Sequence, residues 1–240
     1  MDLRICHLYG DLMSIYGDRG NVLTLQRRAE WRGIAATVET VSAGDRLDPE
    51  RFDLYFFGGG QDAQQDIVAA DLAGPNGVAL KEAIAGGAAV LSVCGGYQLL
   101  GHFYRPFEGP ELPGVSALDV HTVAGRRRFI GNVVATAEQP LVGFENHSGL
   151  TYLGPNAKPL ATIEVGAGNN GEDGSEGAVQ GKVIGTYLHG SLLPKNPWLA
   201  DKVITWALER RNGHVDLPAL DDTAEREARE HAIALAHKRR

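Results

Sequence analysis

Residues 90–101 read Val90-Leu91-Ser92-Val93-Cys94-Gly95-Gly96-Tyr97-Gln98-Leu99-Leu100-Gly101, and this stretch decides the fold. The apolar run over 88–93 has the pattern of a buried parallel strand. A turn of small residues follows, and the apolar residues after it predict a helix. Cys94 is therefore expected at a sharp strand-to-helix turn, the geometry of a nucleophile elbow. A free cysteine is more often a small core residue, but two glycines directly after it favour a reactive thiolate at a helix N-terminus.

Strand and helix patterns alternate on the N-terminal side of this stretch. This alternation predicts an α/β protein with a mostly parallel central sheet flanked by helices. Beyond Gly101 the sequence pattern changes. It predicts short strands of a more antiparallel kind, a polar loop over 166–177, a strand that ends at His189, and a closing helix. The expected strands are 3–9, 36–41, 52–57, 88–93, 121–124, 129–137, 141–147, 161–165 and 183–189, and the expected helices are 22–31, 63–72, 78–85 and 196–211.

The chain is expected to have one domain over residues 1–213 and a helical extension over 214–240. The length of 240 residues suits a single α/β domain with an appendage. The extension begins with a linker that contains Pro218, and the charged, alanine-rich residues 223–240 have a helical pattern. We expect this C-terminal helical tail to lie on the surface or to contact a partner.

Composition excludes several classes of function. The net charge of −7 argues against a nucleic-acid partner. No apolar run approaches the roughly 18–20 residues that span a bilayer, so direct membrane insertion is not expected. The N-terminus lacks a signal-peptide pattern, and only Cys6 and Cys94 occur, which does not make a disulfide framework. These features fit a cytoplasmic protein.

A cysteine nucleophile needs a base, and two histidines are candidates. His189 ends an apolar strand with Gly190 next to it, which exposes its ring at the carboxyl edge of the sheet beside Cys94. His147 also lies at an expected strand end beside glycine, and it is the competing candidate. We favour His189, mainly on the family resemblance given below.

A thiolate that attacks an amide carbon creates an oxyanion, which backbone N–H groups must stabilise. Gly95 supplies one donor. The turn Gly58-Gly59-Gly60 after the strand 52–57 is the expected source of the second, through Gly59 or Gly60. A buried or partly shielded arginine can bind a substrate α-carboxylate with two hydrogen bonds, and Arg128 is the candidate from the basic triplet 126–128.

These residues together resemble the class I, triad-type glutamine amidotransferases, which have a flavodoxin-like fold. The nucleophile motif C-x-G-x-Q of that family matches Cys94, Gly96 and Gln98, although Ser92 replaces the usual preceding glycine. The stretch Leu188-His189-Gly190 is similar to the late motif of the cobyric acid synthase-like branch. The resemblance implies Cys94 as nucleophile, His189 as base, and Arg128 and Gln98 in substrate binding.

Within that branch, the chain is most similar to the small glutaminase subunits of lipid II isoglutaminyl synthases. Matching stretches span nearly the whole chain in order. They are 16–21, 57–60, 94–98, 143–147, 168–170, 185–190 and 193–196.

One departure from the family pattern concerns the base. Most class I members place a glutamate two residues after the histidine, and Ser191 stands there in this sequence. We expect a partner subunit to supply the orienting carboxylate in trans, which predicts a poor glutaminase when the chain is alone. The alternatives within the chain are Glu145 and the loop that contains Asp18.

The resemblance implies that the chain hydrolyses L-glutamine and passes ammonia to a MurT-like Mur-ligase subunit in a heterodimer. The chain lacks the GxxxxGK[ST] pattern of a P-loop, so no cofactor or metal is expected in it, and ATP and Mg²⁺ are expected on the partner. The partner would amidate the D-glutamate α-carboxyl of the lipid II stem peptide. The alternatives are a glutaminase for another synthetase such as a corrinoid amidase, a hydrolase of other γ-glutamyl substrates, and an inactive flavodoxin-like scaffold. A corrinoid synthetase is usually fused to its glutaminase, and 240 residues leave no room for it.

Overall fold

The computed structural model describes residues 1–15, 18–189 and 192–238, and its centre is a six-stranded sheet. The strand order is β11-β12-β4-β3-β1-β2, and all neighbours are parallel except β11 and β12. The strands are β1 (Asp2–Leu8), β2 (Ala35–Val41), β3 (Leu54–Phe57), β4 (Ala89–Val93), β11 (Ala178–Gln180) and β12 (Val183–Thr186). Every residue of β3, β4 and β12 is buried, as expected for central parallel strands.

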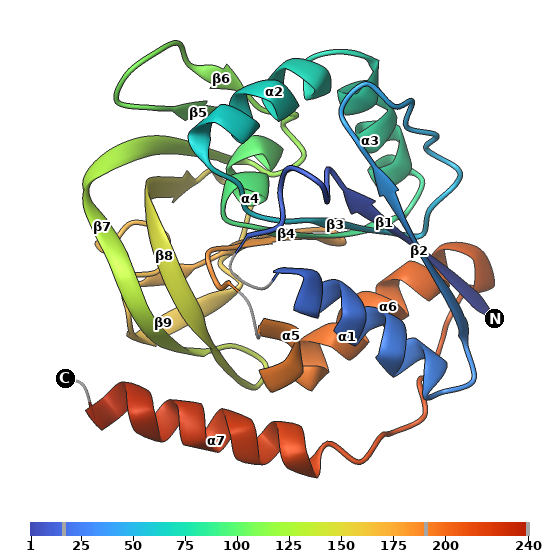
Figure 1. Ribbon diagram of the computed structural model, residues 1–240. Coiled ribbons are helices and arrows are strands. Elements are labelled where there is room, and N and C mark those ends of the chain that lie inside the picture. The colour runs from blue at the N-terminus through green and yellow to red at the C-terminus, as the bar shows by residue number, and fades with distance from the viewer. Residues whose placement is uncertain (16–17, 190–191, 239–240) are drawn as a thin grey trace.

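Helices cover both faces of this sheet, which confirms the predicted α/β class (Figure 1). On one face lie α2 (Asp62–Leu72), α3 (Pro75–Ala85) and α4 (Gly95–Leu100), and on the other lie α1 (Asp18–Glu30), α5 (Leu192–Lys195) and α6 (Pro197–Asn212). Helix α1 begins earlier than the expected residue 22. Its first turn brings the buried side chain of Asp18 to the carboxyl end of the sheet.

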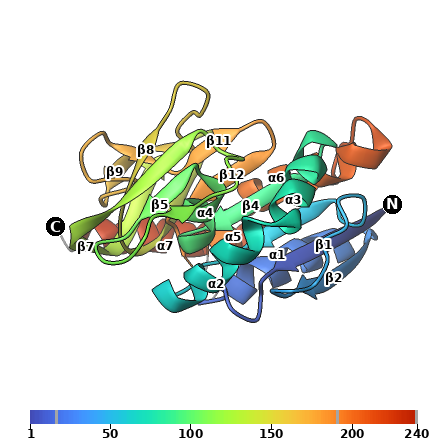
Figure 2. The ribbon, with the colours of Figure 1, turned by 90° about the horizontal axis from the view of Figure 1, so that it is seen from above.

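A second sheet lies beside the first, and the sequence did not predict it as a separate sheet (Figure 2). Its order is β10-β9-β7-β5-β6, with β8 paired to β7. The strands are β5 (Phe103–Arg105), β6 (Leu112–Pro113), β7 (Val120–Thr136), β8 (Pro140–Leu153), β9 (Ala161–Val165) and β10 (Ser175–Glu176). The two short strands expected over 121–137 are one strand of 17 residues. The register with β8 shifts between Ala124 and Phe129, and this irregularity explains the break in the sequence pattern.

The polar loop expected over 166–177 leads into β10 and is partly packed into the core. Asn169, Asn170, Ser175 and Glu176 are all buried there. The Asn169 amide donates to Ser175 Oγ and to the Gly177 carbonyl, both at 2.9 Å. The buried polar side chains thus form hydrogen bonds within the fold, some of them to backbone groups.

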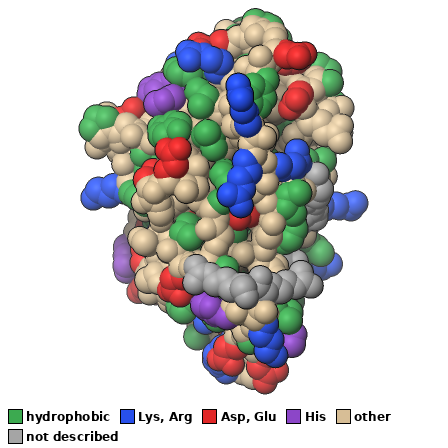
Figure 3. Space-filling view, turned by 90° about the vertical axis from the view of Figure 1, so that its left-hand side faces the viewer, with side chains coloured by type: hydrophobic (Ala, Val, Ile, Leu, Met, Phe, Trp, Pro, Cys, Tyr) green, Lys and Arg blue, Asp and Glu red, His purple; other side chains and the backbone are tan. Residues whose placement is uncertain are grey.

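The C-terminal extension folds back along the molecule as helix α7 (Thr223–Lys238). Ala236, Ala232 and Ile233 pack against a small apolar cluster of Val134, Val142 and Val165, which belong to the second sheet. Figure 3 shows the lower end of one face of the molecule, where α7 displays a mixture of acidic, basic and histidine side chains. The helix therefore buries a narrow apolar stripe and leaves a charged face exposed.

Candidate active site

Cys94 forms the turn between β4 and α4. Its backbone has φ 51° and ψ −109°, a conformation rare for a residue with a side chain. Such a strained residue persists only where its surroundings hold it in place. The Cys94 N–H donates to the Thr186 carbonyl at 2.9 Å, and a Cβ at Gly96 would lie 2.5 Å from the Phe57 carbonyl oxygen. The predicted strand-to-helix turn is thus confirmed, and Cys94 stands at the carboxyl edge of the sheet.

His189 follows the end of β12 and lies beside Cys94. The His189 side chain is buried, and the backbone N–H of His189 donates to the Phe144 carbonyl at 2.9 Å. A Cβ at Gly59 would lie 3.1 Å from His189 Cε1 and 3.3 Å from Cys94 Cβ, so both side chains flank the Gly59 α-carbon. Burial opposes the charged imidazole, but interactions with Asp18 and Cys94 outweigh burial and raise the pKa of His189 to about 10.

The carboxylate nearest to His189 among the described residues belongs to Asp18. Its Oδ1 lies 3.9 Å from His189 Nδ1, and the Asp18 side chain is fully buried. Glu145, the other candidate within the chain, accepts hydrogen bonds at 3.0–3.1 Å from the backbone N–H groups of Ala167 and Gly168. The geometry therefore favours Asp18 over Glu145. Ser191 and Gly190 lie outside the described residues.

The three expected oxyanion donors differ in their surroundings. The Gly59 N–H donates to Asp18 Oδ2 at 2.7 Å, so this structure directs it away from a substrate oxyanion. Gly60 lines the same cavity as Cys94. Gly95 is the first residue of α4, directly after Cys94. Gly95 and Gly60 remain the candidate donors, whereas the assignment of Gly59 needs the Asp18 hydrogen bond to break.

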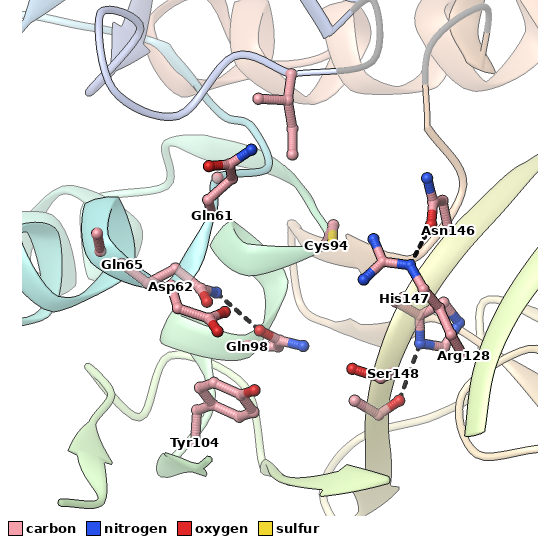
Figure 4. Close-up of a pocket in the computed structure, with 14 residues that line it drawn as sticks. Gln61, Asp62, Gln65, Cys94, Gln98, Tyr104, Arg128, Asn146, His147 and Ser148 are labelled. Carbon is pink, nitrogen blue, oxygen red and sulfur yellow. Dashed lines mark hydrogen bonds between the residues drawn. The ribbon is translucent and has the colours of Figure 1, made fainter. Parts of the chain in front are cut away.

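Cys94 opens onto a cavity of about 420 Å³. Figure 4 shows Gln61, Asp62 and Gln98 on one side of Cys94, and Arg128, Asn146 and His147 on the other. The lining residues are Ile15, Gly60, Gln61, Asp62, Ala63, Gln65, Cys94, Gln98, Tyr104, Arg128, Asn146, His147, Ser148 and Gly149. The expected residues Cys94, Gly60, Gln98 and Arg128 are thus brought together, with His189 buried behind Cys94.

Arg128 reaches this cavity from the irregular part of β7. Its Nε donates to Asn146 Oδ1 at 2.8 Å across the β7–β8 pair. Arg128 is exposed, so it is not the buried arginine that was one of the two possibilities, and it lies at the wall of the cavity. The shift in register bends the strand here and aims the guanidinium over the cavity. A planar guanidinium at a cavity wall suits a carboxylate ligand.

Gln98 belongs to the floor of the cavity. Its Oε1 accepts from Gln65 Nε2 at 2.8 Å, and its Nε2 donates to the Tyr187 hydroxyl at 3.2 Å. The hydroxyl groups of Tyr187 and Thr151 lie 2.7 Å apart. Because both ends of the Gln98 amide are bonded to the protein, this side chain holds the floor in shape.

His147, the competing base, packs on a different side of the site. Its ring stacks on Tyr187 at 3.5 Å between centroids, and its Nδ1 lies 2.9 Å from the Gly149 carbonyl oxygen. Burial and the nearby charge of His189 lower the pKa of His147 to about 4, against a weaker opposing effect of the Gly149 carbonyl. His147 is therefore uncharged at neutral pH and forms part of the cavity wall.

Sequence reasoning missed Asn146 and undervalued Asp18. Asn146 stands in the stretch 143–147, which drew attention for its histidine, and only the pairing of β7 with β8 brings it to Arg128. Asp18 stands in a Gly/Asp-rich loop after β1, where α/β proteins place functional loops. The position of Asp18 in this loop could have marked it as a functional residue, but the sequence did not show that it meets Gly59 and His189.

Metal-ligating clusters and membrane-spanning helices were both sought in the described part of the chain. Over 1–15, 18–189 and 192–238, no three His, Cys, Asp or Glu side chains are grouped to hold a metal ion. Within the same residues, none of the helices has the length and apolar character to cross a bilayer.

Comparison with known proteins identifies the class. The CobB/CobQ-like glutamine amidotransferase domain matches residues 4–197, and the chain belongs to this family. Solved structures share the fold: PurLQS from Thermotoga maritima has a TM-score of 0.58 at 14% identity, covering 87% of this chain and 99% of that chain. A glutamine amidotransferase from Thermotoga maritima has a TM-score of 0.55 at 15% identity, covering 97% and 94%. The resemblance and the predicted enzyme class are confirmed.

Particular relatives narrow the comparison. The chain is 40% identical to the lipid II isoglutaminyl synthase (glutamine-hydrolyzing) subunit GatD of Streptococcus pneumoniae, over 95% of this chain and 89% of that protein. It is 35% identical to the subunit of the same name from Staphylococcus aureus, over 100% and 98%. Cobyric acid synthase of Limosilactobacillus reuteri is 34% identical, but over only 58% of this chain and 29% of that protein.

Proposed function

We propose that this chain is the glutaminase subunit of a lipid II isoglutaminyl synthase and acts in the cytoplasm. It would hydrolyse L-glutamine and supply ammonia to a MurT-like ligase subunit, which amidates the D-glutamate α-carboxyl of the lipid II stem peptide. The observation that carries the proposal is the pairing of Cys94 and His189 at a cavity lined by Arg128, in a chain similar to GatD subunits over nearly its whole length.

The first half of the proposed mechanism forms a thioester. Arg128 binds the glutamine α-carboxylate, and the Cys94 thiolate attacks the carbon of the side-chain amide. The backbone N–H groups of Gly95 and Gly60 stabilise the oxyanion. His189 is charged at neutral pH because its pKa is about 10, so it can protonate the departing nitrogen as the C–N bond breaks. Ammonia leaves, and the γ-glutamyl group remains on the sulfur.

The second half regenerates the enzyme. The imidazole of His189, neutral after giving up its proton, takes a proton from water. The resulting hydroxide attacks the thioester carbon, and the C–S bond breaks to release the Cys94 thiolate and the γ-carboxyl group of the product, which gives its proton to ammonia or water to become glutamate. The proton taken from the attacking water stays on His189, which restores the starting charge state.

The partner supplies what this chain is not expected to bind. ATP and Mg²⁺ would be held by the ligase subunit, which activates the acceptor carboxylate and contacts the lipid-linked substrate. The relatives named GatD are subunits of a synthase, which supports a second subunit for this chain. A carboxylate supplied in trans to His189 remains a prediction, and Asp18 is the alternative within the chain.

The test measures glutamine hydrolysis by this chain alone and with a MurT-like ligase, with Cys94→Ala as the matched control. We expect hydrolysis that rises on adding the partner, vanishes in Cys94→Ala, and yields amidated lipid II when ATP and Mg²⁺ are present. Full activity without a partner would favour a stand-alone hydrolase. No activity with a demonstrably bound partner would favour a scaffold.

The rival proposal is a glutaminase that serves a corrinoid-amidating synthetase. It rests on the similarity to cobyric acid synthase, which spans 58% of this chain. The similarity to GatD subunits spans 95–100%, which favours the first proposal. Ammonia transfer to a corrinoid carboxylate by a cognate synthetase, with none to lipid II, would reverse this preference.

A further inference from the structure

Asp18 touches both halves of the catalytic apparatus at once. Its Oδ2 accepts the Gly59 N–H at 2.7 Å, and its Oδ1 lies 3.9 Å from His189 Nδ1. The Asp18 and His189 side chains are both buried, with exposed fractions of 0% and 1%. In such surroundings a charge acts strongly on its neighbours, because little water screens it.

The carbonyl of Gly59 is also bound, by the backbone of Ile15. The Ile15 N–H donates to the Gly59 carbonyl at 3.3 Å, and the Asp18 N–H donates to the Ile15 carbonyl at 3.2 Å. The turn is also packed tightly, because a Cβ at Gly58 would lie 2.3 Å from the Met13 carbonyl oxygen. Ile15 and Asp18 therefore clamp both polar groups of Gly59.

This clamp sets the direction of the next peptide group. A trans peptide directs its C=O and its N–H to opposite sides. With the Gly59 carbonyl turned toward Ile15, the Gly60 N–H points away from Ile15. The Gly59 N–H is held by Asp18, so the clamp leaves Gly60 to serve as the second oxyanion donor beside Gly95.

We propose that Asp18 is a positioning residue that couples the Gly59–Gly60 turn to the charge state of the His189 imidazole. One carboxylate fixes the backbone that presents the Gly60 N–H and, through its negative charge, stabilises the imidazolium that protonates the leaving nitrogen. This inference rests on the proposed glutaminase function. It differs from a structural role because it predicts a change in proton affinity at His189.

The central test compares Asp18→Asn with Asp11→Asn, an exposed carboxylate in the same loop. The asparagine oxygen can still accept from the Gly59 N–H, but the negative charge is lost. We expect Asp18→Asn to lower kcat for glutamine hydrolysis by about 10–100-fold with KM changed less than about threefold, whereas Asp11→Asn stays near wild type. Asp18→Ala, which also releases the turn, is expected to lose at least as much.

Two further readouts report the proton affinity of His189, and one of them, an NMR titration, does not depend on turnover. The titratable groups that face His189 are Asp18, Cys94 and His147. Removing the Asp18 charge lowers the pKa of His189. We expect two curves to move to lower pH by about one unit or more. One is the high-pH limb of glutamine hydrolysis, and the other is the titration of the His189 imidazole, followed by NMR in the chain alone. The NMR titration tests the coupling even if the proposed function fails.

Several outcomes would overturn the coupling. One is an Asp18→Asn variant with wild-type kcat and an unshifted His189 titration. If the activity of that variant also depends on the partner, the carboxylate is supplied in trans. If Asp18→Asn does not fold, the wild-type chain still decides. A His189 imidazole that titrates at or below its ordinary value near 6.5 would contradict the coupling.

Discussion

At the residue scale, Gly59 occupies the narrow space between the two side chains of the proposed dyad. A Cβ there would lie 3.1 Å from His189 Cε1 and 3.3 Å from Cys94 Cβ. Gly59→Ala is therefore expected to push the imidazole and the thiol apart. Because a misplacement of about 1 Å can cost about 100-fold in rate, we expect kcat to fall about 10–100-fold while the free energy of unfolding changes by about 1 kcal/mol or less.

Steady-state hydrolysis and urea unfolding of Gly59→Ala measure these two effects. The matched control is Gly131→Ala, because a Cβ at Gly131 meets nothing within 4 Å. Equal kcat values for the two variants would show that the space between the dyad side chains is not tight.

Residues that depend on local geometry were predictable from the sequence. The strand, the small-residue turn and the helix around Cys94 are encoded within about a dozen residues, and the turn has the predicted form. The choice between His189 and His147 was not local, since both end apolar stretches beside glycine. The tertiary structure separates them, because His147 stacks on Tyr187 whereas His189 lies beside Cys94 and Asp18.

At the scale of elements, the two-residue strand β10 carries a buried acid into the space between the two sheets. Glu176 accepts hydrogen bonds from the Thr186 hydroxyl and the Tyr187 N–H. These two donors lie at the end of β12, shortly before His189. Burial raises the pKa of Glu176 to about 7, and these hydrogen bonds only partly offset the effect. The folded protein thus holds the Glu176 proton more firmly than the unfolded chain does.

This difference predicts a dependence of stability on pH. In the unfolded chain Glu176 titrates near 4.5, so its contribution to stability is full below that pH and is lost as pH rises through about 7. Glu176→Gln removes the titration. We expect the free energy of unfolding of the wild type, measured with urea, to fall between pH 5 and pH 8.5 by about 3 kcal/mol or less relative to that of the variant.

A carboxylate in the same segment provides the control. Glu172 is exposed, so Glu172→Gln is expected to follow the wild type at both pH values. If Glu176→Gln and the wild type change in parallel between pH 5 and pH 8.5, the Glu176 proton is not held more firmly in the folded state.

Prediction of elements succeeded where the period of the pattern was clear. The buried runs of β3, β4 and β12 were expected, because parallel strands covered on both faces are continuously apolar. The segment 166–177 was predicted as a polar loop, and its partial burial was not predicted. Its polar side chains form hydrogen bonds inside the fold, and composition alone cannot distinguish a polar residue that meets water from one that meets a buried amide.

At the scale of the whole molecule, Arg28 fastens the C-terminal extension to the α/β domain. Its guanidinium bonds to both oxygens of Asp201 at 2.7 and 2.8 Å and to both oxygens of Asp222 at 2.6 and 3.1 Å. The Arg28 side chain is only 2% exposed. Arg32 adds a bond from its Nε to the Pro218 carbonyl at 2.7 Å. The linker before α7 is therefore held against α1 and α6.

Arg28→Met is expected to destabilise the protein by about 2–4 kcal/mol, because it removes the arginine that pairs with the partly buried Asp222 carboxylate and leaves Asp201 paired with Arg32 alone. Arg27→Met is the matched control. Arg27 lies one residue earlier on α1, and its ion pair with Glu30 is largely exposed, so the expected change is about 0.5 kcal/mol or less. Urea unfolding measures both. Equal shifts in the two midpoints would mean that the buried network does not anchor the extension.

The sequence by itself determined the class of this protein and the turn at which its candidate nucleophile, Cys94, lies. The alternation of elements, the turn at Cys94 and the glycine-rich turn at 58–60 are local patterns, and local patterns can be recognised without knowing which segments meet. The motifs also carried the family, which the comparisons confirm.

Only the tertiary structure decided which groups face Cys94 and His189. Asp18 meets Gly59 across 41 residues of sequence, and Arg128 meets Asn146 across 18 residues through a bulged strand pair. Such contacts depend on strand order, on register and on where a loop closes, and a shift of one residue in register turns a side chain to the opposite face. The charge on His189 depends on its burial and on its contacts with Asp18 and Cys94, so the proton chemistry of the site is a property of the assembled fold.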